Sequence, residues 1–210
     1  MKTMANPIRR RRNGSSTIEF VLVSSLFLVP LILGLFSVGF GLIRAMNGIQ
    51  LTRDVGHMWA GGVDFSLQAN QNLMASQLAQ GLNIVSNSGN VTGGSTGNGV
   101  VVFSIFTNLG NSCPTCPNAN HIVLIRRVVV GNHTVFTSAY GVPQSTLINA
   151  INGDIANYSS DISARADNFN NLMTLNAGEI AYFTESYFTA PDLALPGLFP
   201  GLAMYSNAIF

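Results

Sequence analysis

Glu19 is the residue of this 210-residue chain whose position most clearly calls for a chemical explanation. It stands immediately before an apolar run, Phe20 to Ile43, that contains no charged side chain. An ionised carboxylate carried toward the centre of a bilayer costs roughly a few kcal/mol, so this position predicts a cationic partner. Two partners stay open: the amine of a neighbouring subunit inside lipid, or Arg12 in a weak surface pair at the headgroup level.

A junction between two small residues, Gly14-Ser15, lies just upstream of Glu19. Cleavage there would free an α-amino group on Ser15, for which the ordinary pKa is about 7.7 to 8. That ammonium could pair with Glu19 of a neighbouring helix, and a buried pair is best suited to fixing the register between subunits. An ordinary signal peptide differs, because its apolar stretch spans about 7 to 15 residues and the cut follows it.

The basic residues are concentrated ahead of the apolar run. Five of the ten positive charges lie there, on Lys2, Arg9, Arg10, Arg11 and Arg12. Because only Arg44 and Arg53 closely follow the run, the positive-inside rule predicts a cytoplasmic N-terminus. As a helix the run reaches about 36 Å, enough to span a hydrocarbon core of about 30 Å. The remaining chain has more acidic than basic side chains, which argues against a nucleic-acid partner.

These motifs match a family pattern. The residues Gly14, Ser15, Ser16, Thr17, Ile18, Glu19 and Phe20 resemble the processing site of type IV prepilins and pseudopilins. With the arginine-rich leader, Pro30 and the segment Leu51 to Gly56, they resemble the TadE/TadG-like pseudopilins of tight-adherence (Tad) pilus systems. The stretches Glu179 to Phe188 and Leu198 to Leu202 are similar to the closing strand and tail of that family.

The resemblance implies that a membrane-embedded prepilin peptidase cuts after Gly14, and that Ser15, Glu19 and Phe20 take part in assembly. It implies three further partners: other pilin or pseudopilin subunits, an inner-membrane assembly platform and membrane lipid. The implied function is that of a minor pilin or pseudopilin, anchored in a bacterial inner membrane with its head outside the cytoplasm. The alternative is an uncleaved single-pass anchor that presents an extracytoplasmic binding domain.

The chain divides by composition into five parts. They are a basic leader (1–14), a transmembrane helix (15–44), a helical extension (45–85) interrupted at Gly61-Gly62, a Gly/Ser/Asn-rich loop (86–99) and a head (100–210). The expected fold class is α+β, with an antiparallel sheet of about four strands in the head. The strands are expected at 100–107, 121–130, 133–140 and 178–189, with a hairpin at Gly131-Asn132 and an irregular tail from Pro191. The 121–130 strand is expected to be central, with its arginines emerging near one end.

Cys113 and Cys116 form a Cys-Pro-Thr-Cys loop for which a local disulfide is the first interpretation. Thiol oxidoreductase chemistry needs a helix after the first cysteine, and the short segment before the next strand leaves no room for one. Half a zinc site with His121 is a weaker alternative. Neither His57, His121 nor His133 has the spacing of a metal-ligand motif, and no nucleophile elbow occurs. The sequence therefore predicts a protein that is not an enzyme and that needs no metal or cofactor.

Overall fold

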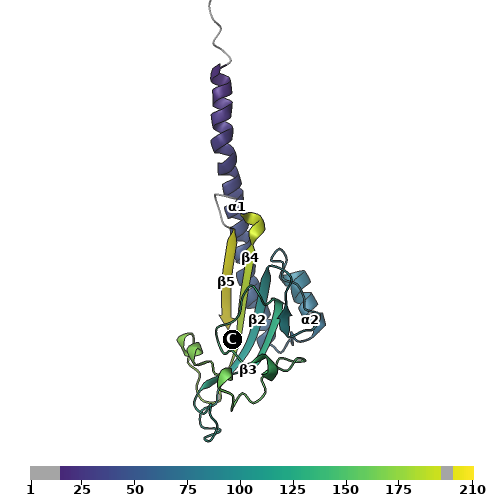
Figure 1. The fold of residues 1–210 in the computed structure, drawn as a ribbon, viewed down its shortest axis with the longest axis vertical. Helices are drawn as coiled ribbons and strands as arrows, with labels where there is room; N and C mark the ends of the chain where they lie inside the picture. Colours follow the sequence, from purple (N-terminus) through teal and green to yellow (C-terminus); the bar gives the residue numbers. More distant parts are fainter. Residues whose placement is uncertain (1–14, 195–200) are drawn as a thin grey trace, which may run out of the picture.

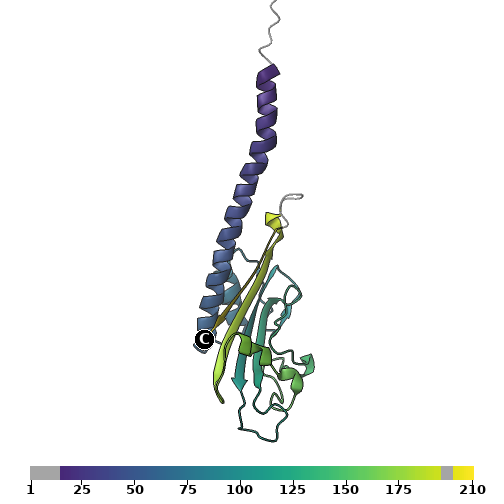
Figure 2. The same cartoon turned by 90° about the vertical axis from the view of Figure 1, so that its left-hand side faces the viewer.

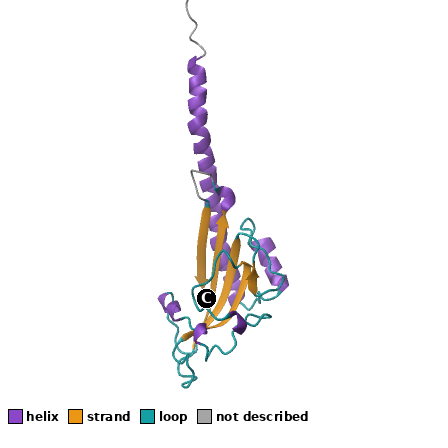
Figure 3. Ribbon diagram, viewed as in Figure 1, coloured by secondary structure: helices purple, strands orange, loops and turns teal. Residues whose placement is uncertain are grey.

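The computed structural model describes residues 15–194 and 201–210, so the predicted leader lies outside the described residues. The helices are α1 (Ser15–Ala60), α2 (Gln68–Leu73) and a π-helical turn (Met74–Leu78). The strands are β1 (Thr92–Gly94), β2 (Gly99–Asn108), β3 (Ile122–Asn132), β4 (Ile180–Ala190) and β5 (Leu202–Ile209). Short 3-10 turns occur at Ser145–Leu147, Ile162–Ala164, Asp167–Asn171 and Pro191–Leu193. Figures 1 and 3 show this arrangement.

Helix α1 runs without a break for 46 residues and has two different environments. Its N-terminal half projects away from the rest of the molecule, whereas its C-terminal half lies along the sheet (Figure 2). The helix ends where Gly61 and Gly62 follow, because Gly62 takes a φ of +93° that side chains rarely tolerate. The interruption of helical structure predicted at these two glycines is confirmed.

The sheet has five strands in the order β1-β3-β2-β4-β5. Neighbouring strands are antiparallel except for β1, which pairs in parallel with β3, so the sheet is mixed. The predicted α+β class with a long apolar N-terminal helix is confirmed. The 121–130 strand, predicted to be central, is an interior strand, because β3 lies between β1 and β2, while β2 occupies the middle of the sheet.

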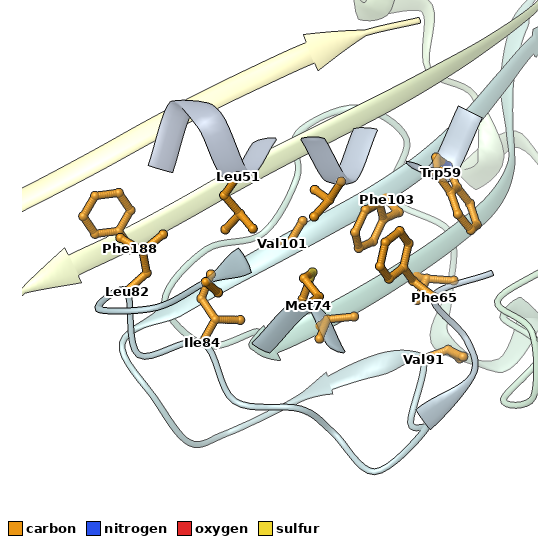
Figure 4. Packing of buried hydrophobic residues seen from close by; sticks show 14 residues of the cluster. Leu51, Trp59, Phe65, Met74, Leu82, Ile84, Val91, Val101, Phe103 and Phe188 are labelled. Carbon is orange, nitrogen blue, oxygen red and sulfur yellow. The ribbon is translucent and has the colours of Figure 1, made fainter. Parts of the chain in front are cut away.

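One face of the sheet packs against α1 and forms the larger core. Leu51, Val55 and Trp59 of α1 are buried there together with Val101, Phe103 and Phe188 of the strands. The rings of Phe65 and Phe103 stack with centroids 4.3 Å apart and planes 8° from parallel. Met74, Leu82, Ile84 and Val91 close the same cluster from the segment after α1, as Figure 4 shows. The C-terminal half of α1 is therefore a structural part of the head.

The predicted 133–140 strand and its hairpin are wrong. The hairpin partner would have to bond the outer edge of β3, and that edge is already occupied. Val129 donates to the carbonyl of Val91, His133 to that of Gly94 and Arg127 to that of Gly153. Residues 133–178 instead cross the second face of the sheet, where Phe106, Phe169 and Phe183 form a smaller core.

Two further predictions are corrected. The tail expected to be irregular from Pro191 contains β5, which pairs with β4 from Ala190↔Leu202 to Phe183↔Ile209. The 86–99 segment, expected to be a flexible linker or long loop, is mostly irregular but contains β1 and the buried Val91. Side-chain amides order this segment: Gln71 accepts from the backbone N–H groups of Asn87 and Gly89.

Candidate functional site

The residues predicted for processing and assembly lie at the start of α1. Ser15 is the first described residue and is already helical, while Glu19 and Phe20 follow in the first two turns and are exposed. Gly14 and the arginines Arg9, Arg10, Arg11 and Arg12 lie outside the described residues. The described part of the predicted site therefore begins a helix whose side chains face outward.

The N-terminal half of α1 exposes a continuous apolar surface. From Phe20 to Phe36 nearly every large apolar side chain is exposed, with Phe20 at 72% and Leu26 at 70%. This is the one helix, among residues 15–194 and 201–210, that is long and apolar enough to cross a membrane. From Ser15 to Phe36 it rises about 33 Å at about 1.5 Å per residue, which suits a hydrocarbon core of about 30 Å.

Among the described residues, hydrogen bonds between the head and α1 begin just beyond Phe36. The hydroxyl of Ser37 donates to the carbonyl of Leu193 at 2.7 Å, and Arg44 forms a two-bond pair with Asp192 at 2.7 and 2.6 Å. Gly41 lies between these contacts, opposite the side chain of Leu202. The end of the sheet therefore meets the helix within the last two turns of the predicted 15–44 segment, and the uncovered part of the helix is shorter than that segment.

A second candidate site is a cavity of about 360 Å³ on the sheet face opposite α1. Its floor includes Val102, Arg127 and Val129 from β2 and β3, and the crossing segment 133–148 forms its wall. Most of the lining is apolar, including Val91, Phe136, Val142 and Ile148. Hydroxyl groups of Thr92, Thr137, Ser138 and Ser145 interrupt this apolar surface.

Arg127 is the charged group of this cavity and is 7% exposed. Its Nε donates to Ser104 Oγ at 3.2 Å, its Nη1 to the Gly141 carbonyl at 2.7 Å, and its Nη2 to Ser138 Oγ at 3.4 Å and to the Tyr140 carbonyl. All four acceptors are uncharged. Burial lowers the pKa of Arg127 to about 10, so the guanidinium keeps its charge at neutral pH.

Glu185 is a second buried charged residue on the same sheet face. It sits opposite Val102 in the register and is 1% exposed, and the hydroxyl of Tyr205 donates to its Oε1 at 2.9 Å. Burial raises the pKa of Glu185, while the hydrogen bonds with Ser138 and Tyr205 and the charge of Arg127 oppose that rise.

The sequence prediction missed both buried charges. Arg127 was expected to emerge at the end of a strand, and Glu185 was noted only as part of the C-terminal resemblance. The usable signal was charged residues inside two largely buried strands, Glu185 in β4 and the adjacent Arg126 and Arg127 in β3, since such residues are rarely buried without a specific environment. Arg126, the neighbour of Arg127, is more accessible and pairs with Asp154 at 2.7 Å.

The cysteines, His57 and His121 do not line the cavity, whereas His133 does. Cys113 and Cys116 form a disulfide within the β2–β3 connection, so the local disulfide is confirmed. His57 packs on the ring of Phe210 with centroids 4.4 Å apart, and His121 Nδ1 lies 2.8 Å from Asp167. His133 Nδ1 lies 2.6 Å from the carbonyl of Gly94. The three histidines therefore occupy three separate places and do not converge.

Comparison with family models, with curated proteins and with solved structures gives no match for this chain.

Proposed function

We propose that the chain is a minor pilin or pseudopilin, a structural subunit of a Tad-like or type IV-like pilus or secretion apparatus. A prepilin peptidase cuts the chain between Gly14 and Ser15, and the mature subunit then enters the assembly. The observation that carries this proposal is α1, one continuous helix with an uncovered apolar half and a half embedded in the head. Such a helix can hold the subunit in lipid first and pack against other subunit helices afterwards.

In this proposal Glu19 and the new amine of Ser15 set the register between neighbouring helices. Both residues lie on the first two turns of α1, on the uncovered half, where a neighbouring helix can approach. Pairing removes two charges from a low-dielectric environment, and it does so only at one axial offset between the helices. The other partners are an inner-membrane assembly platform and lipid, with the N-terminus in the cytoplasm and the head outside.

The alternative function is an uncleaved single-pass anchor that presents a binding domain. The cavity above β2 and β3 favours it, because a concave and mostly apolar site with few polar groups is typical of ligand binding. The two functions share the membrane helix and differ in whether the chain is cut.

Expression of the full chain with a prepilin peptidase, followed by N-terminal sequencing, tests the cut directly. We expect a mature chain that begins at Ser15, and we expect Gly14→Trp to stay uncleaved, since the peptidase must accommodate this residue. Ala5→Trp is the matched control, because it adds the same side chain to the leader away from the junction. A wild-type chain that keeps its leader beside a peptidase shown to be active on another prepilin would refute the proposal.

The register role is tested by Glu19→Ala in cells that assemble the filament. We expect normal cleavage and membrane insertion but little or no variant protein in the assembled fraction. Thr17→Ala, on the same helical turn, should be incorporated like the wild type. Equal incorporation of Glu19→Ala and wild type would show that the carboxylate does not direct assembly.

A further inference from the structure

The cavity opposite α1 has the composition of a site for a small organic acid. Its volume of about 360 Å³ falls within the range of ordinary ligand sites, roughly 300 to 1,000 Å³. Valine, isoleucine and phenylalanine side chains form most of its wall, Arg127 lies on its floor, and His133 also lines it. The buried charge can bind a charged group of a ligand, and the apolar walls can contact an apolar part of the same ligand.

The charge of Arg127 has no direct counter-ion in the head. Among the described residues, the ion pairs involve Arg44, His121 and Arg126, and none involves Arg127. Glu185 is the acid that acts on Arg127 electrostatically, but no ion pair joins the two side chains. A buried cation held only by neutral acceptors costs free energy that a nearby anion would recover.

The hydrogen-bond count of Arg127 leaves room for such an anion. A guanidinium has five N–H donors. Four of them are used, by Ser104, Ser138, Tyr140 and the Gly141 carbonyl. The remaining donor is on Nη1, and the hydroxyl groups of Thr137 and Ser145, which line the same cavity, can donate to a second oxygen. One N–H and a few hydroxyls suit a carboxylate better than a phosphate dianion, which needs more charged donors.

We propose that this cavity binds a small organic monocarboxylate with an apolar body. The carboxylate accepts a hydrogen bond from Nη1 of Arg127, and the apolar body contacts Val102, Val129, Phe136 and Ile148. Ser145 and Val142, both exposed, lie at the entrance. The proposal assigns a binding role to the head and does not depend on the proposed function of α1.

Calorimetric titration of the purified full chain in detergent tests the site. The probes are 3-phenylpropionate and hexanoate, each compared with its uncharged amide, so that the apolar body is constant and only the charge changes. We expect each acid to bind at least about tenfold more tightly than its amide. Similar binding of acid and amide, or no binding of either acid at millimolar concentration, would overturn the proposal.

Ser145→Trp locates the binding without disturbing a buried residue. The indole should occupy the entrance and weaken binding of both acids by at least about tenfold. Gln144→Trp is the matched control, because residue 144 is also exposed but does not line the cavity, and it should bind like the wild type. Because both variants share the same micelle, partition of the acids into detergent cannot explain a difference between them. Unchanged binding in Ser145→Trp would place the acids elsewhere and refute the assignment.

Discussion

Replacement of Gly48 by leucine probes how closely α1 packs on the sheet. A Cβ at this position would lie 2.5 Å from Cε1 of Phe188, whose ring belongs to the larger core and is 2% exposed. Forcing a side chain into such a contact costs about 3 kcal/mol, the upper part of the range for overpacked cores. Leucine recovers nearly 1 kcal/mol of helix propensity relative to glycine. We therefore expect a net loss of about 2 kcal/mol in the free energy of unfolding.

Trp59 provides the assay, because it is the only tryptophan in the chain and is buried against Phe103 with ring centroids 5.5 Å apart. Its fluorescence should report thermal unfolding of the head in the full chain in detergent. A loss of about 2 kcal/mol corresponds to a midpoint lowered by about 4 to 8 °C for a unit of this size. Gly39→Leu is the control on the same helix, since nothing lies within 4 Å of a Cβ there. Equal midpoints for the two variants would refute the close packing of α1.

Three other perturbations have defined outcomes in the same fluorescence assay. Replacing Cys113 and Cys116 by serine should lower the free energy of unfolding by at most about 2 kcal/mol, because the disulfide closes a very short loop and so restricts the unfolded chain little. A larger loss would contradict this reasoning. Burial raises the pKa of Glu185 above 4.5, so the unfolded chain ionises first and the contribution of Glu185 to stability should fall as pH rises past about 4.5. Glu185→Gln should remove this pH-dependent contribution. A pH profile of stability identical to that of the wild type would contradict the argument from the burial of Glu185. Asp192→Asn should lower the free energy of unfolding by about 1 kcal/mol or less, since the pair of Asp192 with Arg44 is partly exposed. High salt should lower the free energy of unfolding of the wild type by a similar amount, because salt screens this pair.

The sequence was sufficient for features that depend on local periodicity or composition. The apolar run, the stop at Gly61-Gly62 and the strands near 100–107 and 178–189 were all predicted close to their observed bounds. These signals are local because each depends on the residues of one element and not on its neighbours in the fold. The disulfide was equally predictable, because two cysteines separated by only two residues leave few other pairings.

Features decided by competition between segments were not predictable. Residues 133–140 have the composition of a strand, but β1 and the 153–155 segment occupy the edge of β3 that they would need. β5 was missed because prolines precede it, although its alternate residues Leu202 and Met204 pack against the larger core. The cavity could not be foreseen, since it depends on how the 133–148 segment crosses the sheet.

The continuity of α1 also determines how the molecule would respond to mechanical load. A pulling force on the N-terminal half of α1 is transmitted along the helix to Leu51, Val55 and Trp59. These side chains are enclosed between the sheet and the segment around Met74. Such a force acts in shear on the whole buried contact at once and cannot open it residue by residue. The junction between rod and head should therefore resist pulling along the helix axis much better than pulling across it.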